Sequence, residues 1–279
     1  MKNICAIVLI LIISSSLAAE SWNKSVDLNL TINQNAYSNN WAGSEVGVIA
    51  WAFSSNSLLE KQLSQKMNNK NTLKLTFGQT INQDRQNHTW ASPTKSTDLI
   101  DFESLLRLTL GILVDPFIDG RIETQFIDMS DTIKNRSLNP IKFTESFGIA
   151  RTLAKKDKLE WNARIGVGFR QNLERLVVGG TNTTNDGGLE FVADFKTPLA
   201  KERITYTSTF SLFQAVFRSG AHLNDDWKAS DVNWENIFSA SITKYLMVNL
   251  YAQLLYDKEI GTGLRIKENL ALGLTVKVI

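Results

Sequence analysis

The chain has 279 residues, with 30 Lys and Arg residues against 28 Asp and Glu residues and a formal net charge of +2. Because charges of both signs are spread evenly, the sequence argues against nucleic acid as a partner. The single cysteine, Cys5, excludes a disulfide framework and a cysteine-based metal site. No linker rich in Pro, Gly or Ser divides the remainder, so we expect one domain after the N-terminal segment.

The first 19 residues are typical of a secretory signal peptide. Lys2 precedes an apolar run from Ile4 to Ile13, and Ser16 and Ala18 supply small side chains before a cleavage site. The run is roughly ten to fourteen residues long, shorter than the ~20 that a helix needs to cross a bilayer. We therefore expect residues 1–19 to be removed on export.

From residue 20 onward, apolar and polar side chains alternate in almost every segment. A period of two places successive side chains on opposite faces of a β-strand. In segment 158–172, for example, Glu160 and Arg164 fall on one face, opposite Trp161 and Ile165. A charged face does not fit a dry core, so one face of each strand must meet water and the other an apolar medium.

This pattern predicts an all-β fold, in which residues 20–279 form a single antiparallel up-and-down transmembrane β-barrel. We count about twelve strands, and a bacterial barrel requires an even number. The predicted strands are 22–34, 44–54, 70–81, 98–112, 115–128, 139–153, 158–172, 187–196, 202–214, 231–244, 246–257 and 264–278.

The connections between these strands differ in length at the two ends. Long outer loops and short periplasmic turns are the signature of an outer-membrane barrel with both termini inside. The predicted outer connections are 35–43, 82–97, 129–138, 173–186, 215–230 and 258–263, and the short ones are 113–114, 154–157, 197–201 and a turn near Tyr245. We therefore expect the protein in the cell outer membrane of a Gram-negative bacterium.

One connection breaks this rule. Segment 55–69 is long yet falls at the periplasmic end. Its apolar residues have a spacing that could form a short amphipathic helix; they are Leu58, Leu59, Leu63 and Met67.

Aromatic residues near the predicted strand ends are candidates for the two girdles of a membrane barrel. Strands favour aromatic side chains in any case, so ordinary packing is the alternative. The candidates are Trp41, Trp51, Trp90, Trp161, Trp227, Trp234, Tyr206, Tyr245 and Tyr256.

The polar face of the strands is the candidate functional site, because it lines the lumen. A barrel of about twelve strands lies between barrels of about eight, which side chains fill, and those of sixteen or more, which hold a water channel. Charges of both signs could pair into a plug or line a narrow polar pore, and the sequence leaves both open. The predicted lumen-lining residues are Asp101, Glu103, Arg107, Asp119, Arg121, Glu123, Glu160, Arg164, Arg170, Glu190, Asp194 and Lys196, with Lys267 and Lys277 on the last strand.

The sequence offers little for catalysis. The chain has two histidines, the residue type suited to acid–base chemistry, and both of them, His88 and His222, fall in predicted outer loops. A phospholipase would need a serine and a histidine on the same strand face, which neither histidine provides. We therefore expect no enzyme activity, cofactor or metal site. An outer-membrane enzyme acting on lipid and a soluble periplasmic β protein are the alternatives.

Several short motifs resemble a Bacteroidota-type outer-membrane family, domain of unknown function 3078. They are Trp22, Asn40-Trp41-Ala42-Gly43, Leu75-Thr76-Phe77-Gly78-Gln79, Thr97-Asp98, Pro116-Phe117, Glu123-Thr124-Gln125-Phe126 and Asn139-Pro140. The chain departs from the family pattern at Ser44, where a second glycine is usual. The resemblance implies a barrel-like envelope protein without an established activity, and it supplies no catalytic residue.

Together these features predict a narrow polar channel, similar to a porin, or a structural or binding protein of the envelope. The expected partners are outer-membrane lipid and the machinery that inserts barrels into that membrane. The sequence does not identify a solute.

Overall fold

The computed structural model describes residues 22–38, 45–131, 134–219, 224–243 and 246–277, with side chains as far as residue 273. The predicted signal peptide (residues 1–19), the Asn40–Gly43 turn, Ser44, His222 and Tyr245 lie outside the described residues, and so does the side chain of Lys277.

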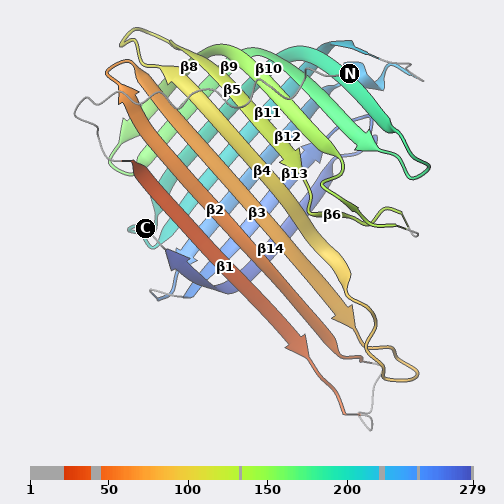
Figure 1. The fold of residues 1–279 in the computed structure, drawn as a ribbon. Coiled ribbons are helices and arrows are strands. Elements are labelled where there is room, and N and C mark those ends of the chain that lie inside the picture. The colour runs from red at the N-terminus through yellow and green to blue at the C-terminus, as the bar shows by residue number, and fades with distance from the viewer. Residues whose placement is uncertain (1–21, 39–44, 132–133, 220–223, 244–245, 278–279) are drawn as a thin grey trace.

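Twelve antiparallel strands close into one barrel, so the predicted fold class is confirmed (Figure 1). They are β1 (Asn23–Asn35), β2 (Val48–Ser64), β3 (Met67–Asn82), β4 (Thr94–Leu108), β5 (Asp115–Thr124), β8 (Ile141–Lys156), β9 (Leu159–Arg175), β10 (Thr181–Leu199), β11 (Ile204–Arg218), β12 (Ser230–Ser241), β13 (Leu246–Tyr256) and β14 (Arg265–Lys277). Around the wall the order is β1, β14, β13, β12, β11, β10, β9, β8, β5, β4, β3, β2. Two further strands, β6 (Ile127–Asp128) and β7 (Arg136–Ser137), pair with each other apart from the barrel.

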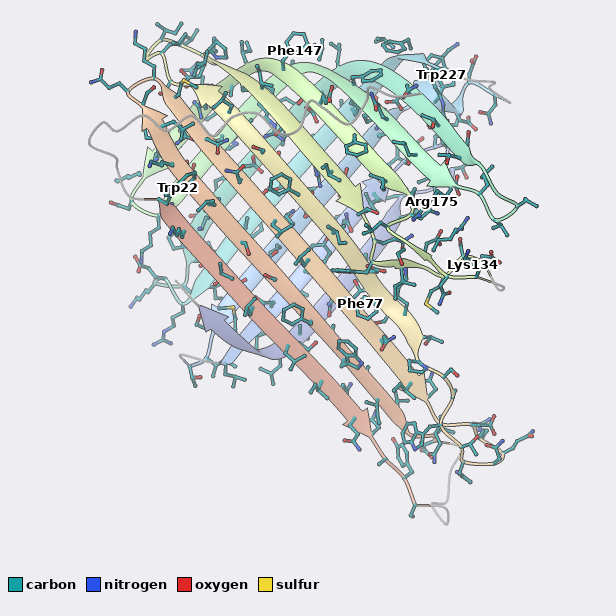
Figure 2. All side chains as sticks on the ribbon, viewed as in Figure 1. Trp22, Phe77, Lys134, Phe147, Arg175 and Trp227 are labelled. Atoms are coloured by element: carbon teal, nitrogen blue, oxygen red, sulfur yellow. The ribbon has the colours of Figure 1, made fainter. Side chains whose placement is uncertain are left out.

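The barrel is apolar outside and polar inside. Ile118 is 64% exposed and Phe147, its partner across the β5–β8 pairing, is also 64% exposed. The next residue pair, Asp119 and Ser146, faces the other way, and each of these residues is 3% exposed. Figure 2 shows Phe77 and Phe147 among the side chains around the wall. This arrangement is the reverse of a soluble protein and suits a wall that stands in an apolar medium.

The two ends of the barrel differ in their connections. β1 begins and β14 ends at the same end, at the left of Figure 1, which we call the turn end. We call the opposite end the loop end. The turn-end connections are residues 65–66, 109–114, 157–158, 200–203 and 242–245, whereas those at the loop end are mostly longer and comprise 36–47, 83–93, 125–140, 176–180, 219–229 and 257–264.

The amphipathic helix considered for segment 55–69 is wrong. β2 continues to Ser64 and β3 begins at Met67, so a tight turn replaces the long connection. The spacing of the leucines misled because Leu58 and Leu59 are successive strand residues on opposite faces. Among the described residues the one helical segment is the 3-10 turn η1 (Asp226–Lys228), and none is long and apolar enough to cross a membrane as a helix.

Several other predicted connections also differ in length in the structure, and the contacts explain two of these differences. The outer loop predicted at 173–186 shrinks to residues 176–180, because the polar Thr and Asn residues after Gly180 pair with β9. The turn predicted at 113–114 instead spans 109–114. The Asp115 carboxylate accepts a hydrogen bond from the Leu110 backbone N–H at 2.9 Å and holds this connection against the wall.

A band of aromatic rings crosses four neighbouring strands near the turn end. Trp161, Phe195, Tyr206 and Phe238 lie on β9, β10, β11 and β12. Successive ring centroids are 6.2, 6.0 and 4.6 Å apart. Trp161 and Phe238 are 44% and 37% exposed, so the band faces outward, as aromatic residues do at a membrane interface.

The pairing of β1 with β14 is short. Among the described residues it comprises four pairs, from Asp27 opposite Lys277 to Leu30 opposite Leu274. β1 pairs with β2 along its whole length, by contrast, from Asn23 to Asn35. Of the pairings around the wall, this one is the shortest among the described residues.

Gly166 is required by a close approach of β8 and β9. A Cβ atom on Gly166 would lie 2.3 Å from the backbone oxygen of Phe147, too close for any side chain. We expect Gly166→Ala to destabilise the barrel by about 1–3 kcal/mol, because the strands must move apart. The effect is measured as the change in the temperature at which the folded band on a detergent gel is replaced by the unfolded band.

Gly120→Ala is the matched control, because a Cβ atom at Gly120 would meet no atom within 4 Å. Equal stability of the two variants would contradict the close approach of β8 and β9.

Candidate functional site

The charged residues predicted in the lumen lie on the inner face of the wall wherever their side chains are described. The strand register aligns Lys74, Asp101, Glu123 and Lys142 in one row across β3, β4, β5 and β8. Asp101 is 5% exposed, whereas its outward neighbour Phe102 is 38% exposed. The alternation seen in the sequence therefore places the charges inside.

The middle of the lumen holds a cluster of ion pairs that we call the crossing network. The Arg121 guanidinium donates to both oxygens of Asp101, at 2.8 and 2.9 Å. It also lies 3.2 Å from Glu123, whose second oxygen is 3.4 Å from Lys142 Nζ. The network consists of Lys74, Asp101, Arg121, Glu123, Lys142 and Glu235. Its three cations and three carboxylates balance, so the buried charges are mutually compensated.

The bridge between Lys74 and Glu235 spans the lumen. Lys74 lies on β3 and Glu235 on β12, and at least four strands separate β3 from β12 on either route around the wall. Their Nζ and Oε2 atoms are nevertheless 3.1 Å apart. Lys74 Nζ also lies 3.9 Å from Asp101, which ties the bridge to the rest of the network.

The predicted residues Glu103, Asp119 and Arg164 form a second cluster. Arg164 on β9 donates to Glu103 on β4, and its Nη2 atom lies 3.6 Å from Asp119 on β5. The guanidinium lies over the Phe117 ring, with its carbon 5.8 Å from the ring centroid. Arg164 is 9% exposed, so this cluster fills the lumen beside the crossing network rather than opening it.

A third set of contacts lies nearer the loop end. Arg170 on β9 donates to both oxygens of Asp186 at 2.7 Å and to Asp231 on β12 at 2.6 Å. Its guanidinium stacks on Phe213, 3.7 Å from the ring centroid. Arg170 therefore connects β9 to β12 across two intervening strands.

At the turn end the inner face surrounds a polar cavity of about 470 Å³. Arg107 lies in its wall, 2.6 Å from Asp115, and donates to Thr152 at 3.0 Å. The predicted residue Glu160 also lines the cavity and accepts from Asn162 at 2.7 Å. The lumen is therefore wide enough for water and small solutes at this end.

The other predicted residues join none of these clusters directly. Asp194 accepts a hydrogen bond from Thr209 at 2.9 Å. Glu190 has a buried carboxylate oxygen that accepts no hydrogen bond from the described residues. Lys196 is exposed at the turn end, and Lys267 lies 5.9 Å from the centroid of the Tyr251 ring.

Sequence reasoning missed Lys74, Lys142 and Glu235. Each has the same signal as the predicted residues, since Lys74 stands between Leu73 and Leu75 and Glu235 follows Trp234. Extending the two-residue period to every strand would have found them.

The β6–β7 hairpin is held at the loop end by a buried polar cluster. Asn139, 1% exposed, donates to Asp128 at 2.7 Å and accepts from the Arg175 backbone N–H at 2.7 Å. Arg136 lies 2.7 Å from Asp128. In Figure 2, Lys134 marks the protruding part of the hairpin and Arg175 its attachment to the barrel. The described residues next to the barrel in the loop predicted at 129–138 are thus held in place by these contacts.

The attachment of the β6–β7 hairpin to the barrel should depend on pH through the ionisation of Asp128. Burial raises the pKa of this carboxyl, but the hydrogen bonds from Asn139 and Ser130 outweigh it and hold the pKa at about 2. A lowered pKa stabilises the fold above the ordinary value of 3.8, and this contribution is lost as the pH falls toward 2. A spin label on Met129→Cys should therefore gain mobility between these two values.

The same label in an Asp128→Asn background is the control. Its mobility should be high at neutral pH and nearly independent of pH, because the ionised partner is gone. A label that responds equally in both backgrounds would contradict the role of Asp128.

The described residues contain no group of three or more His, Cys, Asp or Glu side chains that could hold a metal ion. His88 lies in the connection between β3 and β4, where its backbone carbonyl accepts from Gln83 at 2.7 Å. No hydrogen bond among the described residues joins His88 to a serine of a strand.

Comparisons with known proteins found one family model and several solved structures. A family model described as "Protein of unknown function (DUF3078)" matches residues 32–129, which confirms the resemblance seen in the sequence over that stretch. Trp22 and Asn139-Pro140 lie outside it. The sequence matches none of the curated proteins.

Several solved structures align with most of this chain at low sequence identity. The translocator domain of autotransporter NalP from Neisseria meningitidis is 7% identical, with 90% of this chain and 86% of that chain covered and a TM-score of 0.39. An outer membrane channel from Pseudomonas putida F1 is 11% identical, with 93% and 95% covered and a TM-score of 0.42. The beta domain of the Bordetella autotransporter BrkA is 10% identical, with 92% and 99% covered and a TM-score of 0.34.

The chain is thus a β-barrel of the outer-membrane class, with an apolar outer wall and a charged lumen. Its matched family carries no assigned activity.

Proposed function

We propose that this protein is an outer-membrane β-barrel whose lumen forms a narrow polar channel, constricted at mid-height by the crossing network. The observation that carries the proposal is the Lys74–Glu235 bridge, because it joins opposite parts of the wall through the lumen. A polar cavity lies on the turn-end side of this constriction. Ions and small polar solutes are the species that such a passage admits.

The proposed orientation follows from the ends of the barrel. Short turns face the periplasm in outer-membrane barrels and longer loops face the outside. The turn end is therefore assigned to the periplasm, and the β6–β7 hairpin to the cell surface. Residues 1–19 would direct export, which N-terminal sequencing of the protein from washed outer membranes tests. Release of the chain by carbonate would instead favour a soluble periplasmic protein.

Single-channel recording tests the channel. The mature chain, shown to be heat-modifiable in detergent, is reconstituted in a planar bilayer. We expect discrete conductance steps that are smaller than those of sixteen-stranded porins, because paired side chains fill the middle of the lumen. Glu123→Gln should shift selectivity toward anions, since it removes a negative charge at the constriction. A heat-modifiable protein that gives no steps would contradict the channel.

A binding role for the loop end is the second candidate, and the β6–β7 hairpin favours it. Buried hydrogen bonds fix the hairpin in place, and Val178 in the neighbouring 176–180 connection is 98% exposed. A fixed surface with an exposed apolar tip suits binding at the cell surface. Deletion of residues 129–136 should then abolish ligand or cell-surface binding and leave conductance unchanged.

The proposal assigns no catalysis, cofactor or metal to the chain. Its partners would be outer-membrane lipid and the insertion machinery. Turnover of a phospholipid by the purified protein, lost on replacement of His88 or His222, would contradict this part and favour a lipid-acting enzyme.

A further inference from the structure

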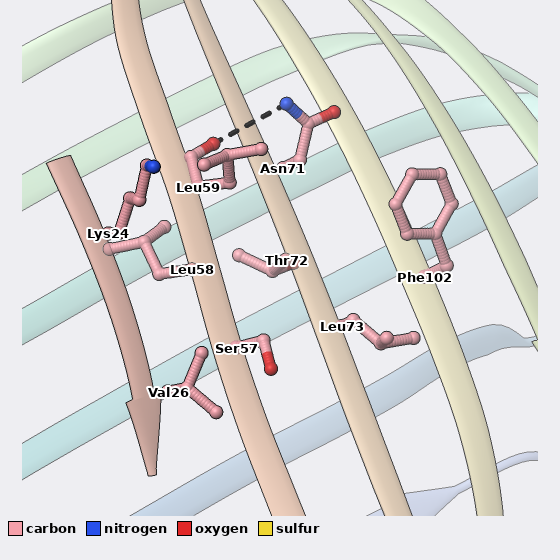
Figure 3. A pocket seen from close by; sticks show the side chains of 9 residues that line it. All are labelled: Lys24, Val26, Ser57, Leu58, Leu59, Asn71, Thr72, Leu73 and Phe102. Atoms are coloured by element: carbon pink, nitrogen blue, oxygen red, sulfur yellow. Dashed lines mark hydrogen bonds between the residues drawn. The ribbon is translucent and has the colours of Figure 1, made fainter. Parts of the chain in front are cut away.

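An apolar groove lies on the outer wall near the turn end. It has a volume of about 310 Å³ and crosses β1, β2, β3 and β4 (Figure 3). This volume is at the lower end of the roughly 300–1,000 Å³ typical of ligand sites.

The strand register explains the shape of the groove. Val26, Ser57, Leu73 and Phe102 form one row of outward-facing residues across the four strands. Ser57 is the small member of this row, so it forms the floor between Val26 and Leu73. Figure 3 shows Phe102 beyond Leu73 on the neighbouring strand. The result is a groove with apolar walls on the outer surface of the barrel.

Positive charge lies at the turn-end side of the groove. Lys24 lines it one residue after the start of β1. Lys61 stands near the end of β2, with its Nζ atom 5.3 Å from the centroid of the Trp22 ring. Among the described outward-facing side chains of β1–β4 in this half of the wall, these two lysines are the charged ones. A lysine and an aromatic ring at a membrane interface are suited to lipid phosphate groups.

We propose that this groove binds one acyl chain of an anionic phospholipid of the periplasmic leaflet, with the phosphate at Lys24. The inference rests on the proposed placement of the barrel in the outer membrane and adds a specific lipid site to it. The acyl chain lies over Ser57 between the apolar walls formed by Val26 and Leu73, and Lys24 with Lys61 supplies the charge that distinguishes an anionic from a zwitterionic headgroup.

Native mass spectrometry of the purified mature chain tests the site, with dioleoylphosphatidylglycerol or dioleoylphosphatidylethanolamine added to the micelles. The wild type should retain one phosphatidylglycerol molecule. Ser57→Leu should lose it, because the larger side chain fills the groove while the outer wall stays apolar. Lys24→Gln should lower the preference for phosphatidylglycerol about fivefold, as loss of one interfacial lysine does.

The matched controls change the same residue types elsewhere on the barrel. Ala163→Leu adds a leucine to the outer face of β9, and Lys158→Gln removes an exposed lysine from the turn between β8 and β9. Both controls should retain lipid as the wild type does. Equal retention by Ser57→Leu and Ala163→Leu would overturn the groove site, and equal retention of the two lipids by the wild type would overturn the role of Lys24. Dissociation of a dimer by Ser57→Leu, without lipid loss, would make the groove an interface between copies and likewise overturn the proposal.

Heat-modifiable migration of every variant keeps the two proposals distinguishable. If the wild type is not heat-modifiable, the barrel placement itself fails. If all variants are heat-modifiable and insert into vesicles but retain lipid alike, the lipid site alone fails.

Discussion

Replacement of both Lys74 and Glu235 by alanine is expected to raise the single-channel conductance severalfold. The double variant removes the bridge that joins β3 to β12 through the lumen and shortens two long side chains at the constriction. It removes one charge of each sign, so the selectivity should change little. Planar-bilayer recording of the step size measures the effect.

The two single variants separate charge from size. Lys74→Ala leaves Asp101 and Glu235 without this cation, so the lumen should become more selective for cations. Glu235→Ala should shift the selectivity toward anions for the opposite reason. The reversal potential under a salt gradient reports both shifts.

The control is the double variant Lys158→Ala and Glu202→Ala. This ion pair lies in the turns of the turn end, with side chains 64% and 60% exposed, and should not affect conductance. If the Lys74 and Glu235 double variant conducts as the wild type does, the constriction lies elsewhere, and the Arg170 contacts become the next candidates.

Arg121→Met is expected to cost about 3–5 kcal/mol of stability, because it leaves two carboxylates in the lumen without their main cation. Asp101 is 5% exposed and receives two hydrogen bonds from Arg121, and Glu123 lies 3.2 Å from the same guanidinium. Chemical unfolding of the detergent-solubilised barrel, followed by its tryptophan fluorescence, measures the loss.

The double variant Arg121→Met and Asp101→Asn should recover part of this stability, because a neutral side chain replaces the stranded carboxylate. Arg203→Met is the control, since this residue is exposed in the turn between β10 and β11. A loss in Arg121→Met no greater than in Arg203→Met would show that lumen water, rather than Arg121, compensates Asp101.

The sequence allows the fold to be predicted because one local rule determines most of it. Residues such as Ile118 and Asp119 differ in polarity and sit next to each other, and a strand must send them to opposite faces. Applied strand by strand, that rule yields twelve strands and a charged inner face. It failed at segment 55–69, where the successive leucines Leu58 and Leu59 interrupt the alternation although the chain stays in a strand.

The contacts of the candidate site are not local, and the sequence therefore could not reveal them. Lys74 and Glu235 are 161 residues apart, and they meet only because the closed sheet brings β3 opposite β12. The cluster around Asn139 has the same character, since it depends on where Arg175 enters from β9. Alternation gives the face on which a charge lies, whereas its partner depends on the curvature and stagger of the whole barrel.

The short pairing of β1 with β14 has a consequence for how the barrel forms. Every other pair of neighbouring strands is joined by a single connection along the chain, and in the case of β5 and β8 that connection contains the β6–β7 hairpin. These pairings therefore need only short loops to close. The pairing of Asp27 with Lys277 must instead bring together the first and last strands, which are the farthest apart along the chain. Assembly should therefore proceed hairpin by hairpin to a curled sheet and end at this pairing. Until then both edge strands expose unpaired backbone groups, which must be shielded while the sheet enters the lipid.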